Sequence, residues 1–247
     1  MPLSLTQTQQ FLAVLNEIAI LFPVLISIFT WRGFIQAFTA KMVGDDTAKR
    51  YGFLTLNPLA HINLNGMLLI MVVFFFLGGL LGNTIPRAIL FILLIMMGVR
   101  WTIPVPFDDR SFKNYRLGGT AMALSGAIGN LLLAFITIPL LKFSRWHGFP
   151  PYVIVTLDEI FRTIIDISLF FGVIDLIPLP PFDGGRVLKY ALPQSMQYIV
   201  QWLEEYALFI FLALFFLPGV SDIFFGGIIM TVFFIKKSMF LLLSLIL

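Results

Sequence analysis

Seven long apolar segments, separated by short polar stretches, most constrain what this chain can fold into. Their approximate bounds are 10–31, 62–82, 86–99, 119–141, 159–179, 196–217 and 223–235. A helix needs about 20 apolar residues to cross the hydrocarbon core of a bilayer, and several of the segments reach that length. The sequence therefore predicts an all-α integral membrane protein. Because 86–99 and 223–235 are short, we expect six to seven transmembrane or re-entrant helices.

The composition supports a membrane protein and excludes several kinds of site. Hydrophobic residues make up 59% of the 247 residues, and charged residues only 12%. In a soluble domain the charged share is near a quarter. The chain has no cysteine, which excludes disulfides, thiolate metal ligands and cysteine nucleophiles. Its net charge of +3 comes from basic residues scattered between the apolar segments, a pattern that favours membrane topology and not nucleic-acid binding.

Lysine and arginine predict an orientation. If all seven segments cross, twelve basic residues lie on one side and three on the other. Lys236 and Lys237 belong to the twelve, whereas Lys142 and Arg145 belong to the three. By the positive-inside rule the richer side is cytoplasmic, so we expect the N-terminus outside, in a bacterial cytoplasmic (inner) membrane. The sequence shows no internal repeat or soluble domain, so residues 1–247 are expected to form a single polytopic membrane domain.

Three stretches carry recognisable motifs. They are Gly44-Asp45-Asp46-Thr47-Ala48 with Asn57-Pro58-Leu59-Ala60-His61, the proline-rich Thr102-Ile103-Pro104-Val105-Pro106, and Asp175 with Pro180-Pro181-Phe182-Asp183-Gly184-Gly185. In pattern and spacing they resemble the site-2 protease family of intramembrane zinc metalloproteases. The resemblance covers roughly residues 10–190, and it implies a site-2-protease-like core followed by C-terminal helices over 196–247.

The zinc-binding H-E-x-x-H motif of that family has no counterpart in this chain. By position, the resemblance places it at Arg32, Gly33 and Gln36. The only histidines, His61 and His147, cannot form the pair four residues apart that such a helix supplies. We therefore expect a degenerate member with no catalytic residues, no bound metal and no cofactor, and a pseudo-enzyme in place of a working protease.

The rest of the cleft implied by the resemblance is expected to persist as a vestigial or partner-binding site. Its residues are Asn57, Pro58, His61, Asn130, Asp175, Pro180, Pro181, Asp183, Gly184 and Gly185. Asp183 occupies the position of the family's third zinc ligand, and a carboxylate at membrane depth needs a partner. We hypothesise that Arg32 lies within about 6 Å of Asp183 and fills the place of the cation. Alternatively, Arg32 reaches out to the membrane surface.

Other polar residues within the apolar segments have structural explanations. His61 is expected to be a hydrogen-bonded histidine at the membrane interface. Gly126 and Gly129 fit close packing between helices. Asp158, Arg162 and Asp166 are four residues apart and are expected to neutralise each other along one helix face.

Three functions remain open. The favoured one is a catalytically inactive homologue that acts as a membrane-embedded binding or structural subunit of a larger membrane complex. Its partners would be other membrane proteins in a hetero-oligomeric complex, and lipids, but no nucleic acid. The first alternative is an active intramembrane metalloprotease with a metal site rearranged around His61, Asp175 and Asp183. The second is a transport or ion-path subunit that uses Asp166, Asp175 and Glu204.

Overall fold

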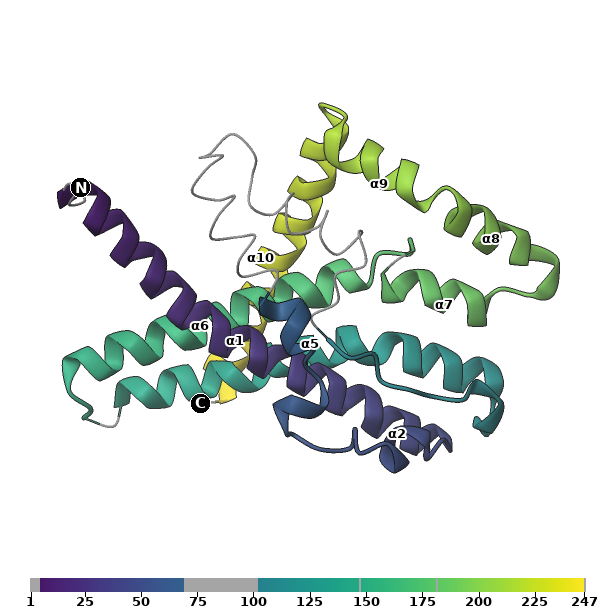
Figure 1. Ribbon diagram of the computed structural model, residues 1–247, viewed down its shortest axis with the longest axis horizontal. Coiled ribbons are helices and arrows are strands. Elements are labelled where there is room, and N and C mark those ends of the chain that lie inside the picture. Colours follow the sequence, from purple (N-terminus) through teal and green to yellow (C-terminus); the bar gives the residue numbers. More distant parts are fainter. Residues whose placement is uncertain (1–4, 69–101, 147, 181, 247) are drawn as a thin grey trace.

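Four long helices dominate the computed structural model, which describes residues 5–68, 102–146, 148–180 and 182–246 (Figure 1). They are α1 (Leu5–Val43), α5 (Tyr115–Trp146), α6 (Pro151–Asp175) and α10 (Val220–Ile246). The shorter elements are α2 (Thr47–Arg50), η1 (Pro58–Ala60), η3 (Asp109–Ser111), α7 (Asp183–Ala191), η4 (Gln194–Met196), α8 (Gln197–Glu205) and α9 (Ala207–Phe216). Within those described ranges the one strand-like pairing is an antiparallel bridge between Ile62 and Thr102. The prediction of an all-α protein is therefore confirmed.

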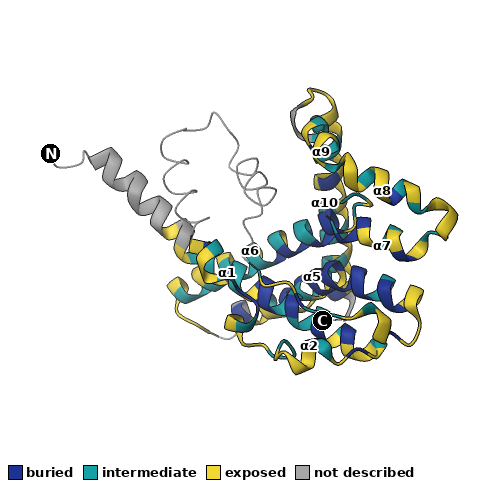
Figure 2. Cartoon of the chain, turned by 45° about the vertical axis from the view of Figure 1, so that its right-hand side comes forward, coloured by how far each residue is buried: buried dark blue, intermediate teal, exposed yellow. Residues whose placement is uncertain are grey.

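Helices α1, α5 and α6 form the packed centre of the fold (Figure 2). The α5–α6 pair is a helical hairpin whose core includes Ile138, Ile165 and Leu169, all fully buried. Helix α1 packs against α5 where glycine allows a close approach, since a Cβ built at Gly129 would lie 3.1 Å from the Cβ of Ile35. The small residues of this span serve the helix packing that the sequence predicts.

Within the part of the chain that the structure describes, three helices are long and apolar enough to cross a membrane: Ala19–Val43, Tyr115–Ser144 and Val220–Ser244. Together with the composition, they make the chain an integral membrane protein. They correspond to the first, fourth and last of the apolar segments. Most of the second segment, beyond residue 68, and all of the third lie outside the described residues.

The two remaining segments differ from a simple crossing helix. Helix α6 carries Asp158, Glu159, Arg162 and Asp166, so it is too charged to count among the crossing helices. The segment 196–217 is divided between η4, α8 and α9, with a break at Tyr206. Amphipathic α8 explains the break, because its glutamines and glutamates favour a polar surface over hydrocarbon. The structure therefore leaves the count of six to seven spans as a prediction.

The last helix corrects the expected position of two lysines. The last apolar segment was expected to end at residue 235, but α10 continues through residues 238–246. Lys236 and Lys237 therefore lie inside the helix. Near its end, Lys142 of α5 donates to the carbonyl oxygen of Leu243 at 3.4 Å. The two lysines are thus on the part of α10 that runs toward Lys142, and the predicted separation of Lys142 from them by the whole membrane is wrong.

A buried aspartate joins the turn after α1 to the segment before η3. Asp45 accepts hydrogen bonds from the backbone N–H of Thr47 at 2.9 Å and of Asp108 at 2.8 Å. Burial alone would raise the pKa of Asp45, but hydrogen bonds from Thr47 and Asp108 and the nearby charge of Arg50 outweigh it and hold that pKa below its usual value. The Asp45 carboxylate therefore links the first motif stretch to the backbone just after the second.

Candidate functional site

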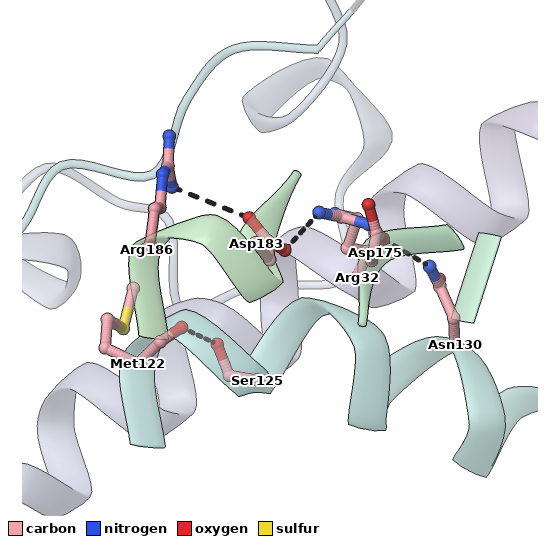
Figure 3. A network of polar contacts seen from close by, with 7 residues as sticks. All are labelled: Arg32, Met122, Ser125, Asn130, Asp175, Asp183 and Arg186. Atoms are coloured by element: carbon pink, nitrogen blue, oxygen red, sulfur yellow. Dashed lines mark hydrogen bonds and ion pairs between the residues drawn. The ribbon is translucent and has the colours of Figure 1, made fainter. Parts of the chain in front are cut away.

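Arg32 joins two aspartates that come from different helices (Figure 3). Its Nη2 donates to Oδ2 of Asp183, the first residue of α7, at 2.5 Å. Its Nη1 donates to Oδ2 of Asp175, the last residue of α6. Both carboxylates are buried. The hypothesis that Arg32 lies within about 6 Å of Asp183 is confirmed, and Asp175 is a second partner that the hypothesis did not include.

Two further side chains complete the network. Arg186, one turn along α7, places Nη1 3.7 Å from Oδ1 of Asp183. Asn130 of α5 donates from Nδ2 to Oδ2 of Asp175 at 3.5 Å. Two carboxylates thus face two guanidinium groups. The Arg32 side chain is only 18% exposed, against 59% for Arg186, so Arg32 carries the buried part of this charge balance.

Gly126 lets α5 pass directly beneath the ion pairs. A Cβ at this position would lie 2.5 Å from Oδ2 of Asp183 and 2.8 Å from Nη2 of Arg32. Any side chain would therefore push the guanidinium and the carboxylate apart. The sequence indicated that Gly126 is a packing residue, but it gave no sign that the packed groups are charged.

The turn between α6 and α7 brings the two aspartates to the same guanidinium. A Cβ at Gly184 would collide with the carbonyl oxygen of Ile177, and one at Gly185 would lie 2.6 Å from the nitrogen of Pro180. The two glycines thus allow the first turn of α7 to lie against the preceding loop. Pro180 belongs to that loop, whereas Pro181 lies outside the described residues.

His61 is buried against α1, and its expected position at the membrane interface stays a prediction. Its Nε2 donates to the carbonyl oxygen of Thr55 at 2.8 Å, and its ring meets Phe53 edge-on at 5.7 Å. A Cβ at Gly33 would collide with Nδ1 and lie 2.9 Å from two ring carbons. Nδ1 of His61 has no hydrogen-bond partner within the part of the chain that the structure describes. The absence of a side chain at Gly33 therefore explains why the ring can be buried.

The other predicted site residues lie in the turn before His61 or follow Arg32 on α1. Asn57 accepts a hydrogen bond from the N–H of Leu59, and Pro58 begins η1, so both shape the turn that leads to His61. Gln36 is partly buried one turn further along α1 than Arg32. Sequence reasoning missed Arg186, although its spacing of three residues from Asp183 on a predicted helix was a usable signal.

The charged residues of α6 pair only in part as expected. Arg162 donates to Asp158 at 2.5 Å, which confirms the first step of the predicted ladder. Asp166 instead bonds to Lys236 of α10, at 2.5 Å. The ladder is broken because α10 brings its own cation to the C-terminal end of the charged stretch.

Comparison with known proteins identifies a relative. A Bacillus subtilis (strain 168) protein named "Putative zinc metalloprotease YwhC" is 33% identical over 196 residues, which are 78% of each chain. This chain belongs to the site-2-protease-like family of YwhC. No family model matches the sequence, and no solved structure matches it. YwhC is named for zinc and proteolysis, so the residues present here must be tested against that metal.

The described residues of this YwhC relative do not fit a zinc ion. Zinc in a protease takes three side-chain ligands and leaves a position for water. Here Asp175 and Asp183 are bridged by a guanidinium that would repel a metal cation, and Nε2 of His61 is bonded to Thr55. No three histidine, aspartate or glutamate side chains gather at one point in the described ranges. A cation is present at this site, but it is a side chain.

Proposed function

We propose that this chain is a catalytically inactive member of the YwhC family and a binding or structural subunit of a larger membrane complex. The observation that carries the proposal is the position of Arg32. It bonds to Asp183, the carboxylate that the resemblance expects as a zinc ligand, and to Asp175. The partners are other membrane proteins and lipids. We place the chain in a bacterial cytoplasmic membrane with its N-terminus outside.

The chemistry of the replaced positions supports inactivity. Arginine stays protonated at any physiological pH, so Arg32 cannot accept a proton from water. A guanidinium also has no open coordination position at which water could become a nucleophile. Gly33 supplies no general base. The groups that remain can bind and hold, but they cannot hydrolyse a peptide bond by the family's route.

The ion-pair network supports a structural role. Arg32 connects α1 to the end of α6 and the start of α7, and the α5 backbone lies beneath it at Gly126. Four elements thus meet at one arginine and the two buried aspartates that it joins. In place of a metal, a side chain fixes their arrangement, which is what a rigid docking scaffold requires.

The observed contacts do not favour the two alternatives. A rearranged metal site would need His61 beside both aspartates, but its bonded nitrogen faces Thr55. An ion path would need a continuous row of acids, but Asp166 is bonded to Lys236 and Asp175 to Arg32. Glu204 is exposed on a separate helix, α8.

Metal content and proteolysis test the proposal. The chain is purified in mild detergent beside the Bacillus subtilis relative, and zinc per chain is measured by mass spectrometry. We expect no stoichiometric zinc in this chain and no cleavage of a transmembrane peptide substrate. Tightly bound zinc, or cleavage that a chelator suppresses, would overturn the inactive assignment. A pure, monodisperse single chain obtained directly from its native membrane would overturn the subunit assignment.

A further inference from the structure

Helix α10 crosses α5 and α6 (Figure 1), with one face buried against them and the opposite face exposed. Its inner face packs on α5 and α6 through Ile228, Val232 and Leu243, among others. The outer face recurs every three or four residues, as one side of a helix does. It consists of Ile223, Gly226, Gly227, Met230, Phe233, Phe234, Lys237 and Leu241. Met230 and Phe234 are 75% and 72% exposed, so this face has no cover from the described helices.

Lys237 stands in the middle of that face, well inside the apolar helix. The crossing segment of α10 extends to Ser244, seven residues beyond it. At 1.5 Å per residue, this is about 10 Å of helix. The hydrogen bond from Lys142 to Leu243 places the end of α10 beside the end of the crossing segment of α5. Lys237 is therefore deeper than the terminal turn from which lysine side chains reach the membrane surface.

The adjacent lysine shows how this chain neutralises such a charge. Lys236 points toward α6 and bonds to Asp166 at 2.5 Å. Lys237 is turned away by one helix position and is exposed, and it pairs with none of the acids whose side chains the structure describes. Residues 69–101, which the structure does not describe, contain no aspartate or glutamate. Among described helices, α10 packs against α5, α6 and α9. The described acidic side chains of this chain therefore supply no anion for Lys237.

We propose that the outer face of α10 binds a transmembrane helix of a different protein, which carries an aspartate or glutamate at the depth of Lys237. A second copy of this chain does not fit, because two copies related by a twofold axis would face Lys237 to Lys237. A Cβ at Gly226 or Gly227 would meet nothing within 4 Å, so both glycines leave room for the backbone of a neighbouring helix.

This inference rests on the proposed function only in treating the chain as a subunit of a complex. The probe is a synthetic transmembrane peptide with a leucine-alanine host sequence and one aspartate at the matching depth. Its control is the same peptide with asparagine, which keeps the shape and removes the charge. The full chain and a labelled peptide are placed together in bilayers of neutral lipid, and binding is measured by energy transfer.

We expect the aspartate peptide to bind about tenfold more tightly than the asparagine peptide. Lys237→Met should abolish this preference, whereas Lys49→Met, at an exposed position on α2, should leave it unchanged. Lys237→Glu should reverse it, so that a peptide with lysine binds best. Equal binding of the two peptides would overturn the proposal, as would a preference that survives Lys237→Met.

A different result would assign Lys237 to lipid. If anionic lipid at low content removes the preference, and Lys237→Met lowers binding of that lipid, Lys237 reaches a headgroup and the proposal is wrong. The failure of this inference is distinguishable from failure of the proposed function. Zinc in the purified chain would refute inactivity and leave the peptide preference intact, whereas equal peptide binding would refute only the α10 surface.

Discussion

Replacing Arg32 with methionine would leave two buried carboxylates without the guanidinium that holds them. Removing one partner of a buried ion pair costs about 3–5 kcal/mol, because the other charge remains without compensation. Two features place Arg32→Met near the lower end of that range. The Arg32 side chain is 18% exposed, so some water reaches the site, and Arg186 stands 3.7 Å from Asp183. We expect a loss of about 3 kcal/mol in the free energy of unfolding.

The assay is reversible unfolding in mixed detergent micelles, followed by the circular dichroism of the helices. The matched control is the triple variant Arg32→Met, Asp175→Asn, Asp183→Asn, which removes the charges together and keeps the shapes. A neutral, similarly shaped set is expected to recover most of the lost stability. If Arg32→Met costs less than about 1 kcal/mol, or if the triple variant is no more stable than Arg32→Met alone, the ion pairs do not hold the site together.

Three further predictions concern glycine packing and the buried aspartate near α2. Gly126→Ala should destabilise the fold by about 1–3 kcal/mol, because the added Cβ would lie 2.5 Å from Oδ2 of Asp183. Its control is Gly226→Ala, in open space on α10, which should be neutral or stabilising in the same unfolding assay. Gly33→Ala should be destabilising by a similar amount, and His61→Ala in the same chain should remove most of that added loss, which a double-mutant cycle measures. The pKa of Asp45 is lower in the folded chain than in the unfolded one. The Asp45 carboxylate therefore stabilises the fold at pH above its unfolded pKa, and this stabilisation is lost as pH falls through its folded pKa. Melting temperatures measured across acidic pH should fall less steeply for Asp45→Asn than for the parent chain.

The sequence was sufficient to predict the class of fold, and it offered the pairing at the centre of the site as one of two hypotheses. Apolar segments of membrane length predict helices, because a helix bonds every backbone polar group within the segment itself. The resemblance placed Arg32 where a metal ligand stands and Asp183 where another stands. Because two such positions must be neighbours in space, the ion pair was one of two hypotheses for Arg32, and the other was a side chain that reaches the membrane surface. Asp175 was not predicted as a partner of Arg32, because the turn between α6 and α7 decides which carboxylates converge.

Features that depend on helix ends and on neighbouring helices could not be predicted. The lysines of α10 were assigned to the end of a span, because a pair of charges after an apolar run usually marks the membrane surface. Asp166 of α6 neutralises one of them, which makes an interior position possible. The burial of His61 likewise depends on contact with Gly33 on another helix. The residues next to His61 or to the lysines of α10 in the sequence do not indicate these contacts with other helices.

Arg32 and Gly33 stand where the resemblance expects metal-site residues, and each contacts a different part of the site. Arg32 supplies a fixed cation to the two aspartates, and Gly33 opens the space that the His61 ring fills. A carboxylate introduced at position 33 would therefore meet the imidazole before it met water. The variant with Arg32→His, Gly33→Glu and Gln36→His restores the expected ligand types, yet it removes the cation and overfills the space beside His61. We expect zinc binding only when His61→Ala is added, as measured by zinc content at equal folded protein. Zinc bound by the triple variant alone would contradict this reasoning, because it would show that the His61 ring moves aside and does not block the site.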